Sequence, residues 1–366
     1  ATAAALALDL ARAFRKRRFI EPLAAGHDIL GGLHANTHLP TIVAAAAAVD
    51  AEAADAGEGD AARAAEGLRA SVQAYCTLQL GYAYAGTAGS SVNEHWPRRA
   101  ASTGAAYRTT FAPPDVEDVD AGGCGDLADA GACERSPEFM RAHCAATCAA
   151  EAAATRGGGG DQGESGGGGV TAASDSDAFH TQESCTTYNA LKLNAELFGR
   201  KPHAALADAF ERKLLNGVVG IARPADEHGP HLGEIIYMMP LGAGVSKEQA
   251  NWAGFGSSDG AFWCCYGTAI ESFAKLNDNL YFEAAEAEAA AAVPELWVSQ
   301  LFVPSEVQWA AGGATVKLQS SLSADRCDTL HVTIELAALS GGGACFGSGG
   351  CALSVRLPSW ADGAAS

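Results

Sequence analysis

Three cysteines have neighbours that suit metal binding or nucleophilic chemistry. Cys185 follows a carboxylate in Glu183-Ser-Cys185, and Cys264 and Cys265 are adjacent in Phe-Trp-Cys-Cys-Tyr-Gly-Thr. Each cluster directly precedes an amphipathic segment, so we expect it at a helix N-terminus, where free N–H groups and the helix dipole favour thiolates. Three thiolates and one carboxylate are ligands that suit Zn²⁺. The alternatives are a vicinal disulfide at Cys264–Cys265 and buried free cysteines.

Two further polar residues stand in loops. Glu94 lies in the Gly- and Ser-containing segment 87–96, and loops of this kind often carry functional side chains on a rigid scaffold. His34 lies in the segment 32–40, before a helix that we expect to begin at Pro40. The alternatives are a solvated loop carboxylate at Glu94 and simple helix capping by Asn36 or Thr37.

The elements that must position these residues are mainly helical. Ala-rich segments with apolar residues at helical spacing run near 2–19, 40–55 and 60–84. A second helical block has apolar stripes near 188–198, 206–215 and 270–280. After Pro294 the pattern changes to alternating, β-branched runs, which predict a β-sandwich-like module from strands at 296–299, 314–318, 330–334 and 353–357.

Residues 100–176 follow neither pattern. Two tetraglycine runs, at 157–160 and 166–169, make 151–176 a flexible linker. The insertion also holds four closely spaced cysteines, enough to stabilise a unit that is too small for a hydrophobic core. We favour disulfides over a zinc knuckle, because no Cys-x-x-Cys pair is present among Cys124, Cys133, Cys144 and Cys148.

Length and charge exclude some classes of protein. A chain of 366 residues has room for two or three domains. It carries 43 acidic against 24 basic residues, a net charge of −19, which repels phosphate backbones and argues against a nucleic-acid partner. No apolar run approaches the ~18 to 20 residues of a membrane span. The apolar run 3–9 precedes basic residues, the reverse of a signal peptide, so we expect residue 1 to lie inside a longer protein.

The segment 124–148 resembles the ShK toxin-like module, with its Gly-x-Cys, Pro-x-Phe-Met and Cys-x-x-x-Cys patterns. That family has six cysteines, and the two that lack counterparts here are partners of each other. The resemblance therefore implies the disulfides Cys124–Cys144 and Cys133–Cys148. It also implies an oxidising location, in the secretory pathway or outside the cell, and a role in docking or spacing.

Five motifs, in the family's order, resemble glycoside hydrolase family 127, the β-L-arabinofuranosidases. The resemblance extends over residues 12–98 and 178–360 and implies a mainly α fold with a β module, an (α/α)6 barrel followed by a β-sandwich. Fewer long helices are predicted than the barrel needs, so we expect a partial barrel in a chain truncated at both ends. The motifs lie at 33–40, 89–96, 183–192, 262–268 and 301–306.

The same resemblance implies a role for each candidate residue. Cys264 would be the nucleophile at the anomeric carbon, and Glu94 the general acid/base, with retention through a glycosyl-cysteine intermediate. His34 and Tyr237 match positions that hold the sugar. The Zn²⁺ ligands would be Glu183, Cys185, Cys264 and Cys265.

These features predict a succession of regions along the chain. They are a first part of the catalytic barrel at 1–99, an insertion at 100–176, a second part of the barrel at 177–290, and an incomplete β-sandwich at 291–366. The insertion would contain the ShK-like module at about 120–150 and the linker at 151–176. Four cysteines have no assignment, although spacing would allow Cys345 and Cys351 to close a Gly-rich loop; the other two are Cys76 and Cys327.

The predicted function is that of a zinc-dependent, retaining glycoside hydrolase. It would release terminal β-L-arabinofuranose from arabinose-containing glycoproteins or cell-wall glycans. One alternative is a related glycosidase with a different pentose or linkage. The other is a non-catalytic, zinc-stapled protein that binds glycan or protein. The sequence carries no signal for an oligomeric state.

Overall fold

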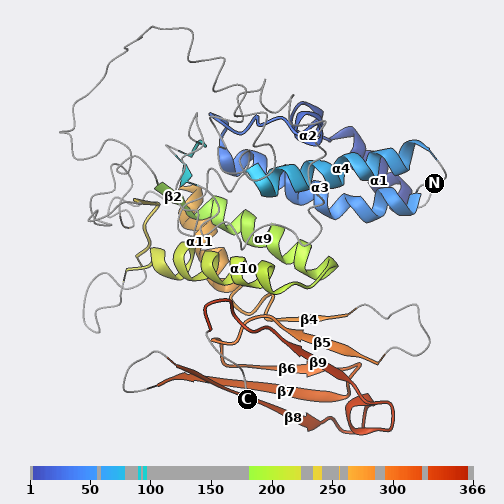
Figure 1. The fold of residues 1–366 in the computed structure, drawn as a ribbon. Helices are drawn as coiled ribbons and strands as arrows, with labels where there is room; N and C mark the ends of the chain where they lie inside the picture. Colours follow the sequence, from blue (N-terminus) through green and yellow to red (C-terminus); the bar gives the residue numbers. More distant parts are fainter. Residues whose placement is uncertain are drawn as a thin grey trace, which may run out of the picture. The chain divides into compact units, whose positions relative to one another are not determined.

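The computed structural model describes residues 3–55, 59–78, 90–91, 94–96, 181–223, 234–240, 255, 263–284, 293–323 and 329–361. The chain divides into two compact units (Figure 1), one formed by Ala1–Glu196 with Arg212–Phe273 and the other by Leu197–Glu211 with Ala274–Ser366. The predicted linker, the predicted disulfides Cys124–Cys144 and Cys133–Cys148, and Cys327 lie outside the described residues.

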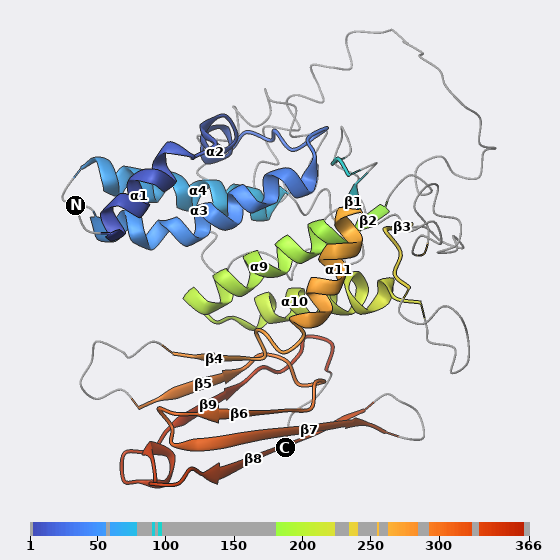
Figure 2. The same ribbon diagram turned by 180° about the vertical axis from the view of Figure 1, so that it is seen from behind.

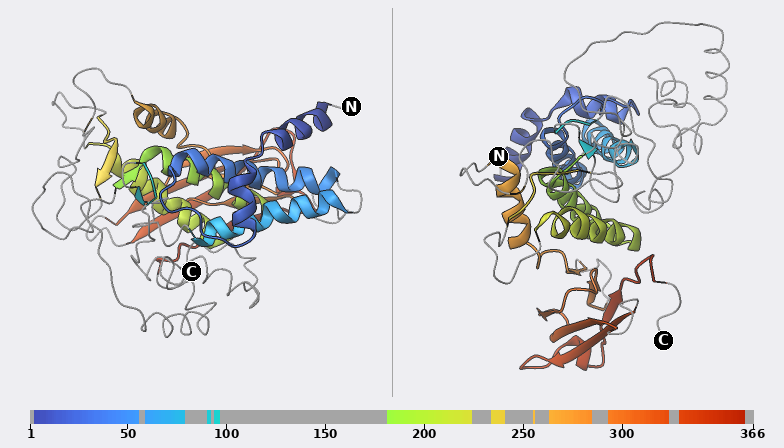
Figure 3. Two further views of the ribbon diagram at one scale, coloured as in Figure 1. Left: turned by 90° about the horizontal axis from the view of Figure 1, so that it is seen from above. Right: turned by 90° about the vertical axis from the view of Figure 1, so that its left-hand side faces the viewer.

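The N-terminal part of the first unit contains the helices α1 (Ala3–Ala13), α2 (Arg17–Ala24), α3 (Ala35–Asp55) and α4 (Asp60–Leu78). α3 and α4 pack side by side, as Figures 1 and 3 show, and α2 packs on α4. The single helix predicted near 2–19 is thus two helices. Arg12 and Arg15, at the break, both pair with the fully buried Glu52 of α3. The Arg12 guanidinium, with that of Arg15, lowers the pKa of Glu52.

The predicted start of α3 is wrong by one helical turn or more, because the helix begins at Ala35 and not at Pro40. Two N–H groups in the first turn of α3 have identified partners, one adjacent to the helix in the sequence and one distant from it. The Thr37 N–H donates to His34 Nδ1 at 3.3 Å, and the Ala35 N–H donates to the Glu94 carbonyl at 2.9 Å. The ring of His34 therefore caps the helix, a role that we had considered for Asn36 or Thr37.

The rest of the first unit joins a small sheet to helices that begin beside it. Figure 2 shows strands β1 (Ser90–Ser91), β2 (Thr181–Glu183) and β3 (Met238–Pro240) near one end of α11 (Cys264–Ala274). The strands are antiparallel with β2 in the centre, and Glu183 pairs with Met238. α9 (Ser184–Arg200) follows β2 directly, and α10 (Ala204–Gly217) follows α9. The segment Leu197–Glu211, which contains the end of α9 and most of α10, belongs to the second unit. Helices that begin at Ser184 and Cys264 confirm the predicted N-termini.

The second unit confirms the strands predicted after Pro294. One sheet has the order β4 (Tyr281–Glu283), β5 (Glu295–Val298), β9 (Ala352–Val355), and the other has the order β6 (Ser305–Trp309), β7 (Ala314–Leu322), β8 (Leu330–Ala338). Leu296 of the first sheet shares a buried cluster with Trp309 and Val316 of the second, as in a sandwich. Cys345 and Cys351 form a disulfide before β9.

The helices that the structure describes form no closed barrel, so the (α/α)6 arrangement and the truncation stay predictions. None of these helices combines the length and the apolar character that crossing a membrane requires.

Lys213 of α10 is a buried charge inside the first unit. It is 2% exposed, and the thiol of the fully buried Cys76 on α4 is close enough to interact with it electrostatically. Burial lowers the pKa of Lys213 to about 7 from its usual 10.5, and burial raises the pKa of Cys76 from 9.0 to about 12. Between pH 7 and 9 the unfolded chain therefore holds a proton on this lysine that the folded chain has released.

Because the unfolded state binds more protons in this interval, Lys213 makes the protein more stable as the pH rises from 7 to 9. We predict that Lys213→Met removes this part of the pH dependence. Urea unfolding at both pH values measures it as the change in the free energy of unfolding. The control is Lys192→Met, at an exposed lysine of α9, which should keep the wild-type slope. An unchanged slope in Lys213→Met would show that the buried lysine is not responsible.

Candidate metal and catalytic site

The seven site residues that lie in the described part of the chain come together in the first unit. Glu183 ends β2, and Cys185 lies in the first turn of α9. Cys264 and Cys265 are the first two residues of α11, and Tyr237 immediately precedes β3. The other two members are His34 and Glu94, whose segments form an antiparallel bridge between His34 and His95.

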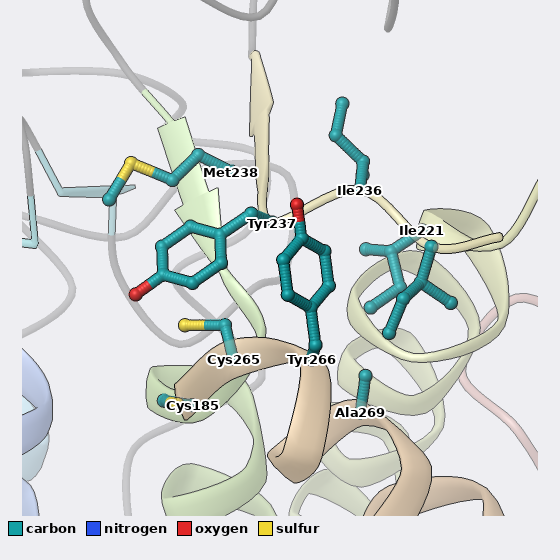
Figure 4. Packing of buried hydrophobic residues seen from close by; sticks show 9 residues of the cluster. Cys185, Ile221, Ile236, Tyr237, Met238, Cys265, Tyr266 and Ala269 are labelled. Carbon is teal, nitrogen blue, oxygen red and sulfur yellow. The ribbon is translucent and has the colours of Figure 1, made fainter. Parts of the chain in front are cut away.

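Five donor groups form a compact cluster. The sulfur atoms of Cys185, Cys264 and Cys265 all lie within 4.8 Å of one another, and so do the donor atoms of Glu94, Glu183 and Cys265. Cys265 belongs to both groups. Figure 4 shows its side chain between Cys185 and the ring of Tyr237, within a buried cluster that draws on four separate segments. Cys264 is exposed, so one thiol of the cluster is accessible.

Neighbouring hydroxyl groups orient the cluster. Thr186 donates to Glu183 Oε2 at 3.1 Å, and Cys185 Sγ lies 3.0 Å from Thr268 Oγ1. Ser184 donates to the carbonyl of Cys265 at 2.8 Å, which ties the start of α9 to the start of α11. Sequence reasoning missed these three residues. The signal was present, because each lies one to four positions from a predicted ligand.

The position at the start of α11 does not by itself favour thiolates at Cys264 and Cys265. The neighbouring thiol of Cys185, burial and the Glu183 carboxylate raise the pKa of Cys265 well above its usual range. Burial likewise raises the pKa of Cys264. Burial and the charge of Glu94 raise the pKa of Glu183 to about 7. Each group disfavours the charge of the next, so the cluster needs a cation to be ionised.

The donor set fits Zn²⁺. Glu183 is 0% exposed, and its carboxylate accepts hydrogen bonds from the Thr186 hydroxyl and from the thiols of Cys265 and Cys185. A buried carboxylate of this kind is stabilised by a positive partner, and a divalent ion would supply one. Thiols such as Cys185, Cys264 and Cys265, and a carboxylate such as Glu183, are donor types that Zn²⁺ takes at tetrahedral sites. All four cysteines of the described residues outside the Cys345–Cys351 bridge are free, so Cys264 and Cys265 form no vicinal disulfide.

A hydrogen-bonded chain links the exposed thiol to Glu94. The hydroxyl of Tyr237 donates to Glu94 Oε1 at 2.6 Å and lies 3.0 Å from Cys264 Sγ. Because one hydroxyl reaches both atoms, the carboxylate and the sulfur are less than about 6 Å apart. Retaining glycosidases hold their two catalytic groups about 5 to 5.5 Å apart.

His34 completes this chain and has a defined tautomer. The Thr37 N–H donates to Nδ1, so Nδ1 is an acceptor and the proton of the neutral ring is on Nε2. Nε2 lies 3.1 Å from Glu94 Oε2 and donates to it. The side chain that caps α3 therefore also holds the carboxylate.

The backbone of Glu94 is strained, with a φ of 68° that non-glycine residues rarely adopt. Pairing with the segment before α3 maintains it. Gly32 N–H donates to the Trp96 carbonyl and Trp96 N–H donates to the Leu33 carbonyl, both at 2.9 Å. Strain that the surroundings impose on one side chain is common at functional sites.

Comparison with known families identifies two segments. Residues 155–278 match the family described as the GH127 catalytic domain of β-L-arabinofuranosidases, and residues 117–150 match the ShK domain-like family. Both matches confirm the resemblances seen in the motifs. The first match includes the thiols, Glu183 and Tyr237 and supports a glycoside hydrolase, whereas His34 and Glu94 lie outside it. A comparison with curated proteins gave no match.

We predict that the purified protein binds one equivalent of zinc, and that Cys185→Ser or Glu183→Gln loses most of it, because each removes one of four ligands. Elemental analysis after dialysis measures the ratio of zinc to protein. Cys76→Ala, which removes a buried cysteine outside the cluster, is the matched control and should retain the metal. Full zinc content in both ligand variants would contradict the assigned donor set.

We predict that the two roles of His34 separate in two variants. Asn is a good N-cap, so His34→Asn should keep α3 stable but lose the contact with Glu94, whereas His34→Ala should also lose about 1 kcal/mol of stability. Denaturant unfolding and hydrolysis of an alkyl glycoside, whose leaving group needs a proton, measure the two effects. Wild-type activity in His34→Asn would show that the ring does not position Glu94.

Proposed function

We propose that this chain, with its family 127 catalytic segment, is a retaining glycoside hydrolase that releases terminal β-L-arabinofuranose. Cys264 is its nucleophile and Glu94 its general acid/base. The observation that carries the proposal is the hydroxyl of Tyr237, which contacts both of these groups at once. The two contacts keep the nucleophile and the acid within about 6 Å of each other, which is compatible with the separation of about 5 to 5.5 Å typical of retaining enzymes.

In the first step the thiolate of Cys264 attacks the anomeric carbon, and the bond from that carbon to the leaving oxygen breaks. Glu94 gives its proton to the leaving oxygen, so the aglycone departs as an alcohol. The product is a thioglycoside on Cys264 with inverted configuration. The exposure of Cys264 supports this role, because the other two thiols of the cluster are buried.

In the second step Glu94, now a carboxylate, removes a proton from water. The water oxygen bonds to the anomeric carbon, and the sulfur of Cys264 leaves as a thiolate. Two inversions give net retention. The single proton of the Tyr237 hydroxyl suits both stages. It can stabilise the Cys264 thiolate before attack and the Glu94 carboxylate afterwards, because both atoms are within its reach.

Zinc would be held by Glu183, Cys185, Cys264 and Cys265, and when bound it would keep these thiols deprotonated near neutral pH. The chain's own residues then orient the reacting groups. His34 and Tyr237 hold the two oxygens of Glu94, and Thr268 lies beside Cys185.

The arabinose would come from glycoproteins or cell-wall glycans. A disulfide at Cys345–Cys351 and the ShK-like match support a location in the secretory pathway or outside the cell. The helices of the first unit would belong to an (α/α)6 barrel, and the sandwich-like unit would accompany it, as the resemblance implies.

We predict that Glu94→Gln slows the release of poor, alkyl leaving groups by about 10²- to 10⁴-fold, the usual value of general acid catalysis. An activated aryl β-L-arabinofuranoside needs no proton, so its first step should be nearly unaffected. Without a base the second step is slow, and the protein should gain the mass of one anhydropentose on Cys264. Release of the aryl group and intact-protein mass spectrometry measure both effects.

The matched control is Cys264→Ala, which should release neither kind of aglycone and should gain no mass. Equal slowing of the first-step release of alkyl and aryl groups in Glu94→Gln would contradict the acid role. A folded, zinc-loaded wild-type protein that releases no arabinose would contradict the proposed function and would favour a glycan-binding role.

A further inference from the structure

Trp263 is a large apolar side chain exposed next to the proposed nucleophile. It immediately precedes Cys264, and 43% of its surface is accessible to solvent. Other exposed aromatic side chains occur in the described residues, but among them Trp263 is the one whose ring contacts Tyr237, the residue that links Cys264 to Glu94. Its ring meets that of Tyr237 edge-to-face, with centroids 5.7 Å apart and an angle of 86° between planes.

The position of Trp263 is fixed by its backbone. Its carbonyl accepts hydrogen bonds from the N–H groups of Tyr266 and Gly267, at 3.1 and 3.4 Å, which places Trp263 at the N-cap position immediately before α11. Its ring packs against Tyr237, a residue that is only 3% exposed. Hydrogen bonds therefore fix the backbone of Trp263, and the contact with Tyr237 fixes its ring. The exposed part of the indole faces solvent. A rigid, exposed aromatic surface suits the apolar face of a sugar ring.

The side chains of the site differ in their exposure to solvent. Glu183 and Cys265 are fully buried, Tyr237 is nearly so, and Cys264 and Trp263 are exposed. A terminal sugar that reaches Cys264 is attached through its scissile oxygen to the rest of the glycan, and this remainder must extend toward solvent. Trp263 lies on that exposed side.

We propose that Trp263 is a stacking platform for the leaving part of the substrate, the ring attached through the scissile oxygen. The inference rests on the proposed function and deepens it. Substrates whose second component is a sugar ring bind through this contact, whereas a methyl glycoside does not use it. Trp263 thus favours glycans with a second ring over simple glycosides.

Binding to a catalytically impaired protein tests this inference without requiring turnover. The background is full-length Glu94→Gln, titrated by calorimetry with methyl β-L-arabinofuranoside and with a disaccharide that carries β-L-arabinofuranose at its non-reducing end. Adding Trp263→Ala should weaken binding of the disaccharide about ten-fold, the size of one stacking contact, and leave the methyl glycoside within two-fold. Trp263→Phe, which keeps a smaller ring, should fall between.

The matched control is Phe14→Ala, which removes another exposed aromatic ring of the first unit and should change neither affinity. If Trp263→Ala weakened the binding of both ligands equally, the indole would only support Tyr237, and the proposed stacking role would be wrong. Absence of disaccharide binding in both Glu94→Gln and the wild type would also overturn it. If the wild type binds the disaccharide through Trp263 but does not hydrolyse it, the platform stands and the proposed reaction fails.

Discussion

The site depends on a carboxylate buried among sulfur atoms. Glu183 is fully buried, and its charge is opposed by burial and by the nearby carboxylate of Glu94. The neighbouring thiol of Cys185, burial and the charge of Glu183 likewise raise the pKa of Cys265. A protein interior tolerates such a group of acids only as neutral species or around a cation. Zinc binding would therefore decide both the stability and the reactivity of this cluster.

The fold brings the donors together because the end of β2, the start of α9 and the start of α11 lie close to one another. β2 ends at Glu183 and α9 begins at the next residue, while the pairing of Glu183 with Met238 places Tyr237 beside the cluster. α11 begins with its two cysteines there as well, and Ser184 ties the two helix starts together. Short strands and first turns are stiff elements, so they fix reactive side chains more closely than a long loop would.

The acid/base candidate is positioned differently. Glu94 lies outside the segment that matches family 127, and it is held by strained backbone, by His34 and by Tyr237. The ring of His34 caps α3 and donates to the carboxylate, so the stability of that helix and the orientation of Glu94 depend on one side chain. Glu94 thus connects the N-terminal helices with the matched segment.

The sequence by itself determined the features that depend on neighbouring residues. The helix starts at Ser184 and Cys264, the strands after Pro294, and the types of residue needed for a zinc-thiolate site all follow from local pattern and composition. Tertiary structure decided the rest. The bond from the Ala35 N–H to the Glu94 carbonyl, the contact of His34 with Glu94, the raised pKa of Cys265 and the bridging place of Tyr237 all arise from partners distant in the chain. Hydrogen bonds and burial between such partners exist only after folding, so no local pattern encodes them.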